Sequence, residues 1–179
     1  MMLLQRFDQA QQLVVISDGA EWIRRFCEWL PSPPLMILDL FHVKHRVWDV
    51  ATALHPGNKA AAASWARTQI ERVEQGCAKA VIDALRFTNA PNEAVTAMTG
   101  ELSTYLSNNL DRMDYPTYRA MGLRVGSGAI ESTNYHVTGA RLKQQGMRWT
   151  QLGAADMAML RADLFNDNWR ARTREMLAA

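Results

Sequence analysis

A carboxylate and a basic segment lie about three helical turns apart in the second half of the sequence. Glu131 follows the run Gly126-Ser127-Gly128, and Arg141-Leu142-Lys143 comes further along the same predicted helix. The glycines permit a sharp turn, and Ser127 can cap the unpaired amides of a helix that begins there. We therefore expect Glu131 in the first helical turn. A fixed carboxylate beside a basic face suits metal-assisted chemistry on a polyanion.

The helix that carries Glu131 is predicted to present one polar face. The residues of this face recur at spacings of three and four, namely Glu131, Asn134, Thr138, Arg141 and Gln145. A structural explanation competes with the functional one, because the helix dipole alone favours an acidic residue in the first turn. The polar face is thus either a site for metal and phosphate or an ordinary solvated surface.

Two further acids each follow a short apolar run. Asp18 comes after Leu13-Val14-Val15-Ile16 and one serine, and Asp39 comes directly after Leu35-Met36-Ile37-Leu38. Such runs are typical of buried strands in an α/β sheet, and sites in these folds are built at the carboxyl ends of the strands. Asp18 and Glu131 could therefore share a pair of Mg²⁺ ions, which activate water or a 3′-hydroxyl for phosphodiester displacement.

The segment after the second apolar run has two interpretations. Asp39, His42 and His45 have the spacing Asp-x-x-His-x-x-His, which could form a transition-metal cluster. In the other interpretation Asp39 caps a helix and His42 orients a neighbouring group by a hydrogen bond.

The order of elements predicts an α/β fold with a large all-helical insertion. Strand, helix, strand and helix alternate over residues 1–55, and helices fill residues 56–118 and 119–179. A turn is expected at Asp111–Pro116. The apolar positions at helical spacing are Ile23, Phe26, Cys27 and Leu30; Val43, Val47, Val50, Ala51 and Leu54; Ala66, Ile70, Val73, Cys77, Ala80 and Ala84; Val95, Met98, Leu102, Leu106 and Leu110; and Met157, Leu160, Leu164 and Phe165.

Composition restricts the class of protein. The 179 residues are 48% hydrophobic, enough for a folded core, and the formal net charge is only +2. Five basic residues and one acid occupy the range 119–148, so the positive charge is local. Cys27 and Cys77 are expected to be buried free thiols in a reducing compartment. We expect a cytoplasmic protein without a membrane segment, because no window approaches the apolar length that a bilayer requires.

Four ordered motifs resemble bacterial insertion-sequence transposases of the ISKra-like type, which are related to Mutator-like transposases. The motifs are Ser17-Asp18-Gly19-Ala20-x-Trp22-Ile23, Leu38-Asp39-x-Phe41-His42-Val43, Gly126-Ser127-Gly128-x-Ile130-Glu131-Ser132 and Gly139-Ala140-Arg141-Leu142-Lys143-x-x-Gly146-Met147-x-Trp149. The resemblance extends from about Leu13 to Arg161.

This resemblance implies an RNase H-like sheet with an Asp, Asp, Glu triad and a helical insertion before the Glu. Asp18 then corresponds to the second acid and Glu131 to the third, and both would bind Mg²⁺ or Mn²⁺. Asp39 and His42 correspond to a supporting Asp-x-x-His element. The first acid of the family lies on a strand that would precede Val14, where this sequence has only Asp8. We therefore expect a partial RNase H-like fold in a truncated or split transposase.

Several basic residues are candidates for contacts with DNA, both transposon ends and target. Lys and Arg neutralise phosphates, and an aromatic ring can stack on an unpaired base. The candidates are Arg124, Arg141, Lys143, Arg148 and Trp149. The competing interpretation treats the charges as solvated and Trp149 as part of the core.

Three functions remain open from the sequence. The first is Mg²⁺-dependent DNA cleavage and strand transfer, with the missing acid supplied by an upstream transposase segment or by a homo-oligomer. The second is an inactive DNA-binding or subunit-association remnant. The third is a nonfunctional helical remnant of gene decay.

Overall fold

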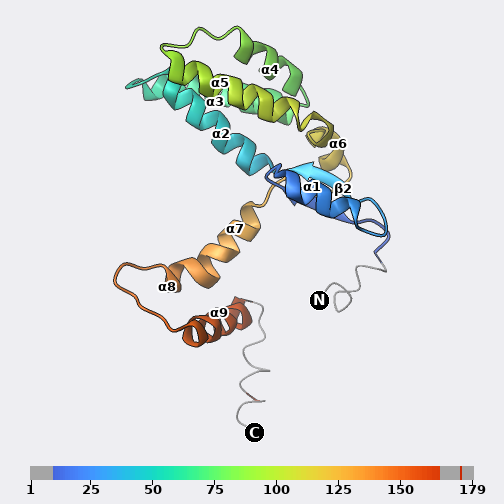
Figure 1. Ribbon diagram of the computed structural model, residues 1–179, viewed down its shortest axis with the longest axis vertical. Coiled ribbons are helices and arrows are strands. Elements are labelled where there is room, and N and C mark those ends of the chain that lie inside the picture. Colours follow the sequence, from blue (N-terminus) through green and yellow to red (C-terminus); the bar gives the residue numbers. More distant parts are fainter. Residues whose placement is uncertain (1–9, 166–173, 175–179) are drawn as a thin grey trace. The chain divides into compact units, whose positions relative to one another are not determined.

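The computed structural model describes residues 10–165 and residue 174, so Asp8 lies outside the described residues. These residues form two compact units, which meet along the chain between Ser127 and Gly128 (Figure 1). Each unit is described by itself. The described chain is mostly helical and contains one small parallel sheet.

The first unit begins with the predicted alternation of strands and helices. Its elements are β1 (Val14–Ser17), α1 (Glu21–Glu28), β2 (Leu35–Leu38) and α2 (Leu40–Leu54). β1 and β2 pair in parallel, with Val14 opposite Leu35 and Ser17 opposite Leu38. Parallel pairing requires a long crossover, which α1 and the proline-rich segment after it provide. The α/β character of this region is therefore confirmed, with two strands in the part that the structure describes.

Helices make up the rest of the first unit. They are α3 (Lys59–Glu74), α4 (Ala78–Arg86), α5 (Glu93–Ser107), the 3₁₀ turn η3 (Leu110–Arg112) and α6 (Tyr115–Ala120). Side-chain oxygens cap several of them: Asn58 accepts from the Ala61 amide at 3.0 Å, and Asn92 accepts from the Val95 amide at 3.0 Å. These bonds satisfy amides that have no partner within the helix.

One hydrophobic core joins the second strand to the helices. α2, α3, α4 and α5 form a closed series, in which each helix contacts two of the others (Figure 1). Ile37 and Leu38 of β2 and Val43 and Val47 of α2 are all fully buried and belong to this core. The predicted apolar positions of α2, α3 and α5 supply much of this core. The residues of 1–55 and 56–118 thus share a core.

Several predictions about this unit are wrong. The stripe from Ala66 to Ala84 is divided between α3 and α4, because the chain turns at Gly76 with a φ of +80°, which favours glycine. Cys77 lies at this break and is exposed, whereas Cys27 is buried as expected.

The segment expected to be a turn, Asp111–Pro116, also differs from the prediction. It contains part of η3 and the start of α6, because Asp114 accepts from the Thr117 amide at 3.3 Å and Pro116 fits a first helical turn. On α1, Phe26 is 52% exposed, although its spacing had placed it on the apolar face.

The second unit contains α7 (Gly128–Asn134), the π-helical turn η4 (Tyr135–Gly139), α8 (Ala140–Leu142) and α9 (Gln151–Phe165). Arg161 of α9 donates through Nε to the His136 carbonyl at 2.7 Å, and the His136 and Phe165 rings lie 5.8 Å apart. The predicted final helix is therefore confirmed as α9, and the contacts around His136 join it to η4.

The described helices include none that is long and apolar enough to cross a lipid bilayer.

Candidate functional site

The carboxyl ends of β1 and β2 bring two acidic residues to one edge of the sheet. Ser17 is paired with Leu38, so the next residues, Asp18 and Asp39, leave the sheet at the same end. The Asp39 amide donates to the Ser17 carbonyl at 2.7 Å, which extends the pairing by one step. This edge is where α/β folds usually place their sites.

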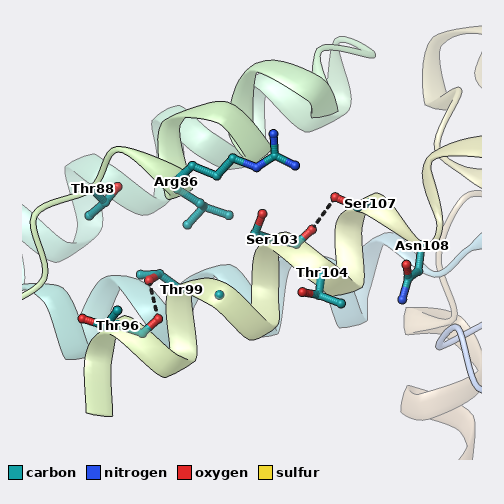
Figure 2. A pocket seen from close by; sticks show the side chains of 10 residues that line it. Arg86, Thr88, Thr96, Thr99, Ser103, Thr104, Ser107 and Asn108 are labelled. Carbon is teal, nitrogen blue, oxygen red and sulfur yellow. Dashed lines mark hydrogen bonds between the residues drawn. The ribbon is translucent and has the colours of Figure 1, made fainter. Parts of the chain in front are cut away.

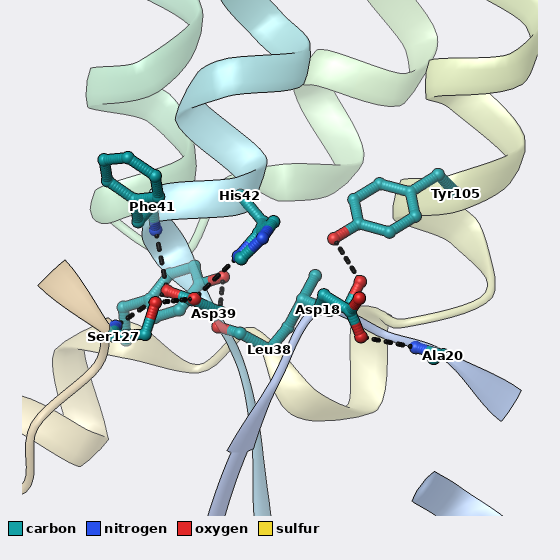
Figure 3. A network of polar contacts seen from close by, with 9 residues as sticks. Asp18, Ala20, Leu38, Asp39, Phe41, His42, Tyr105 and Ser127 are labelled. Carbon is teal, nitrogen blue, oxygen red and sulfur yellow. Dashed lines mark hydrogen bonds and ion pairs between the residues drawn. The ribbon is translucent and has the colours of Figure 1, made fainter. Parts of the chain in front are cut away.

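Asp39 is a buried centre of hydrogen bonds (Figure 3). Its side chain is almost completely buried and caps α2, with Oδ1 accepting from the Phe41 amide at 3.0 Å. Oδ1 also accepts from the Ser127 amide at 3.0 Å, and Oδ2 accepts from the Ser127 hydroxyl. His42 Nδ1 lies 2.7 Å from Oδ2. These four contacts occupy the acceptor sites of the carboxylate and join β2, α2 and the Gly126-Ser127 segment.

The environment of Asp39 keeps it ionised. Burial by itself would raise the pKa of this carboxyl, but the hydrogen bonds from Ser127, His42 and Phe41 outweigh burial and lower the pKa below its ordinary value. A carboxylate can only accept, so His42 donates through Nδ1. Where the ring is neutral, this bond leaves Nε2 as its acceptor atom.

His45 does not join Asp39 and His42. Its Nε2 lies 3.9 Å from a carboxylate oxygen of Asp49, one turn further along α2. Within residues 10–127, no three Asp, Glu, His or Cys side chains come close enough to share a metal ion. The interpretation of Asp-x-x-His-x-x-His as a metal cluster is therefore wrong. The structure has the other interpretation, in which Asp39 caps α2 and His42 forms an orienting hydrogen bond.

Asp18 has a different environment at the end of β1. Its side chain is exposed, and Oδ1 accepts from the Ala20 amide at 3.0 Å, which tightens the turn before α1 (Figure 3). Gly19 makes this turn with a φ of +89°, and an added Cβ would lie 3.0 Å from Leu38 Cδ1. Asp18 is thus held by a local turn and keeps acceptor capacity for a ligand.

Two tyrosine hydroxyls hold the strand ends in place. Tyr105 of α5 donates to the Asp18 carbonyl oxygen at 2.9 Å, and Tyr115 of α6 donates to the Leu38 carbonyl oxygen at 3.0 Å. Burial raises the pKa of Tyr105 to about 12; the nearby Arg46 opposes this shift, and the charges of Asp18 and Asp39 add to it. Burial also raises the pKa of Tyr115, so both hydroxyls stay protonated and act as donors.

Glu131 lies in the first turn of α7, as the sequence predicts, and it is half-buried. The helix beyond it differs from the prediction. Residues 135–139 form a π turn, in which the Ala140 amide donates to the Tyr135 carbonyl five residues back. α8 ends at Leu142, so Gln145 lies outside the helix. The expectation of one regular polar face from Glu131 to Gln145 is therefore wrong, because the π turn changes the register.

The candidate DNA contacts are all exposed. Arg124 lies in the first unit, before Ser127, and Arg141, Lys143 and Arg148 lie in the second. Trp149 is 39% exposed, so it is not buried in a core. Solvent exposure leaves these side chains accessible to a polyanion.

A groove of about 480 Å³ lies between α4 and α5 (Figure 2). Its wall is rich in hydroxyl side chains, and several of these donate to backbone carbonyls of their own helices, such as Thr99 to Thr96 at 2.8 Å and Ser107 to Ser103 at 2.7 Å. The groove is lined by one charged side chain, Arg86, whose Nη1 lies 3.7 Å from Asp83 Oδ1. The groups suited to catalysis are therefore at the strand ends and not in this groove.

Three contributors to the strand-end site were missed by the sequence analysis. Ser127 was expected to cap a helix, but its amide and hydroxyl both donate to Asp39, 88 positions earlier. Tyr105 and Tyr115 were not singled out, and no spacing rule links them to β1 or β2. Contacts between residues so far apart in sequence depend on the packing of α5 and α6.

Comparison with known proteins gives one match. The model of the uncharacterised protein family UPF0236 covers residues 3–176. No curated protein sequence and no solved structure matches the chain significantly. The chain therefore belongs to the uncharacterised protein family UPF0236.

Proposed function

We propose that this chain is the C-terminal catalytic portion of a DDE transposase, which cleaves DNA and transfers strands in a reaction that depends on Mg²⁺ or Mn²⁺. In this proposal β1 and β2 are two strands of an RNase H-like sheet, and α3 to α6 belong to its helical insertion. The observation that carries the proposal is the pair of acids at the sheet edge. Asp18 is exposed there with acceptor capacity, and the neighbouring Asp39 binds the Gly-Ser-Gly segment that leads to Glu131.

The donor chemistry fits the proposed metal. Asp18 and Glu131 would hold it, because carboxylate oxygens are the ligands that Mg²⁺ and Mn²⁺ prefer. The bound ion would activate the attacking oxygen and stabilise the leaving oxygen. Three residues separate Ser127 from Glu131, so their Cα atoms stay within about 14 Å whatever arrangement the two units adopt. A further carboxylate, which the resemblance places before Val14, would complete the site.

The supporting residues would organise the site without binding metal. Asp39 has its acceptor sites filled by Phe41, Ser127 and His42. Its role is to hold the carboxyl end of β2 against the segment that precedes α7. His42 keeps Nε2 as an acceptor at the same edge, where it can receive a hydrogen bond from substrate or water.

The test is nicking of a labelled DNA duplex that carries the ends of the element. The chain is assayed with Mg²⁺, alone and together with the polypeptide encoded directly upstream of it. We expect activity in the mixture, reduced to background by Asp18→Ala or Glu131→Ala. Asp83→Ala, which removes an exposed carboxylate on α4, is the matched control and should leave nicking unchanged. Nicking that survives both Asp18→Ala and Glu131→Ala would refute the assignment of the site.

A second function is favoured by one observation. Arg124, Arg141, Lys143 and Arg148 are exposed, which fits a DNA-binding or subunit-association module without catalysis. Such a module would bind DNA with a strong dependence on salt and would not nick it in either preparation. The nicking experiment with and without the upstream polypeptide separates the two functions.

A further inference from the structure

Arg46 lies on the same face of α2 as His42, one turn further along. Its guanidinium carbon is 4.3 Å from the centre of the Tyr105 ring on α5. The hydroxyl of that tyrosine donates to the Asp18 carbonyl oxygen at 2.9 Å. One tyrosine therefore links a cation on α2 to the turn that carries Asp18.

The contact with Tyr105 orients the guanidinium without neutralising it. Arg46 is exposed and forms no ion pair with any carboxylate in the described part of the chain. Asp49 and Glu101 border the same small hollow beside it, but the contact assigned to Asp49 is with His45. A guanidinium held over a ring is restrained in position, while N–H groups that do not face the ring stay available.

This arrangement suits recognition of a phosphate. A guanidinium presents two parallel N–H donors that match two phosphate oxygens. Lys44, on the same helix, is differently placed, because it pairs with Glu74. Arg46 thus combines exposure with a charge that no ion pair neutralises, and it contacts the tyrosine whose hydroxyl binds the Asp18 carbonyl.

We propose that Arg46 binds a backbone phosphate of the DNA strand that lies at Asp18, and that Tyr105 positions Arg46 for this contact. The identity of the substrate rests on the function proposed above. The contact itself is a binding interaction, so it can be measured without cleavage.

The test is binding of a fluorescein-labelled DNA duplex, followed by anisotropy in EDTA over a series of salt concentrations. One lost phosphate contact should reduce the slope of log K against log salt by about 0.9 for Arg46→Gln. Arg67→Gln removes an exposed charge on α3 and should leave the slope unchanged. Arg46→Lys should keep most of the slope but weaken binding several-fold, because a lysine lacks the planar donor pair.

Tyr105→Leu tests whether the position of Arg46 matters for DNA binding, apart from its charge. It leaves Arg46 charged but removes the ring that orients it, so we expect weaker DNA binding in the same direction as Arg46→Gln. Melting temperatures identify any variant that fails to fold, and Arg46→Gln should melt as the unmodified chain does because Arg46 is exposed.

The outcomes distinguish this inference from the proposed function. An unchanged salt slope for Arg46→Gln overturns the inference, even where Mg²⁺-dependent nicking is observed. A reduced slope in a protein that never nicks DNA supports the phosphate contact and refutes catalysis. Equal slopes for Arg46→Gln and Arg67→Gln would also overturn it, because the effect would then be one of net charge.

Discussion

Two aspartates occupy equivalent places at the ends of paired strands and have opposite environments. Asp18 follows β1, is exposed and accepts one local bond from the Ala20 amide. Asp39 follows β2, is buried and accepts from Phe41, Ser127 and His42. The difference shows that a shared position after a strand does not determine the role of an acid. The segment packed over it does, and here that segment is Gly126-Ser127.

The sharpest test of this comparison replaces each aspartate by asparagine. Asp39→Asn removes the charge on which the donors of Ser127, His42 and Phe41 converge, so we expect a loss of about 2–4 kcal/mol in the free energy of unfolding. Asp18→Asn should change it by less than about 0.5 kcal/mol, since asparagine can keep the turn bond. Urea unfolding followed by circular dichroism measures both. Equal losses would show that the two carboxylates have the same structural role.

The dependence of stability on pH sharpens the comparison further. Asp39 has a pKa below its ordinary value of 3.8, so its contribution is complete above that value and is lost as the pH falls through the lowered pKa. Glu74 adds to the same loss: burial would raise its pKa, but Lys44 and Arg119 lower it below 4.5. Urea midpoints between pH 6 and 3 should therefore fall steeply below about pH 4.

Variants identify which residues cause the fall in urea midpoint at low pH. Asp39→Asn and Glu74→Gln should each make the fall in midpoint shallower, because each removes one group that takes up a proton on unfolding. Asp18→Asn is the matched control. If the urea midpoint fell as steeply with pH in Asp39→Asn as in the unmodified chain, the lowered pKa of Asp39 would be contradicted.

The smallest expected effects concern the two tyrosines. Tyr115→Phe removes a fully buried donor from the Leu38 carbonyl and should cost about 1–1.5 kcal/mol. Tyr105→Phe removes a donor from the more exposed Asp18 carbonyl and should cost about 0.5 kcal/mol. The same unfolding measurement compares them. A larger loss for Tyr105→Phe would mean that the end of β1 is held more firmly than the end of β2.

Local patterns predicted those parts of the fold that local interactions determine. The four-residue apolar runs gave β1 and β2, and the spacing of Val43, Val47 and Val50 gave the buried face of α2. The capping role of Asp39 also follows from its place before a helix. The position of Glu131 in a first helical turn follows from the glycines before it, which permit a sharp turn at the start of the helix.

Other features depend on packing and escaped the prediction. The chain changes direction at Gly76, between α3 and α4. The spacing of apolar residues continues unchanged through this break, so the spacing alone does not predict it. The contact of Ser127 with Asp39 joins residues 88 positions apart, so no local pattern predicts it. Arg46 had a usable signal, its four-residue spacing from His42, but its contact with Tyr105 depends on how α2 packs against α5.

The π turn at Tyr135–Gly139 sets the angle around the helix axis between Glu131 before it and Arg141 after it. One additional residue in a helix rotates everything after it by about 100° relative to an uninterrupted α-helix. Arg141 therefore points in a different direction from the one that its ten-residue separation from Glu131 would give. Deleting a single residue from this turn would restore the α-helical phase and swing the basic side chains around the axis. The rotation between the two side chains therefore depends on how many residues the turn contains more than on which residues they are.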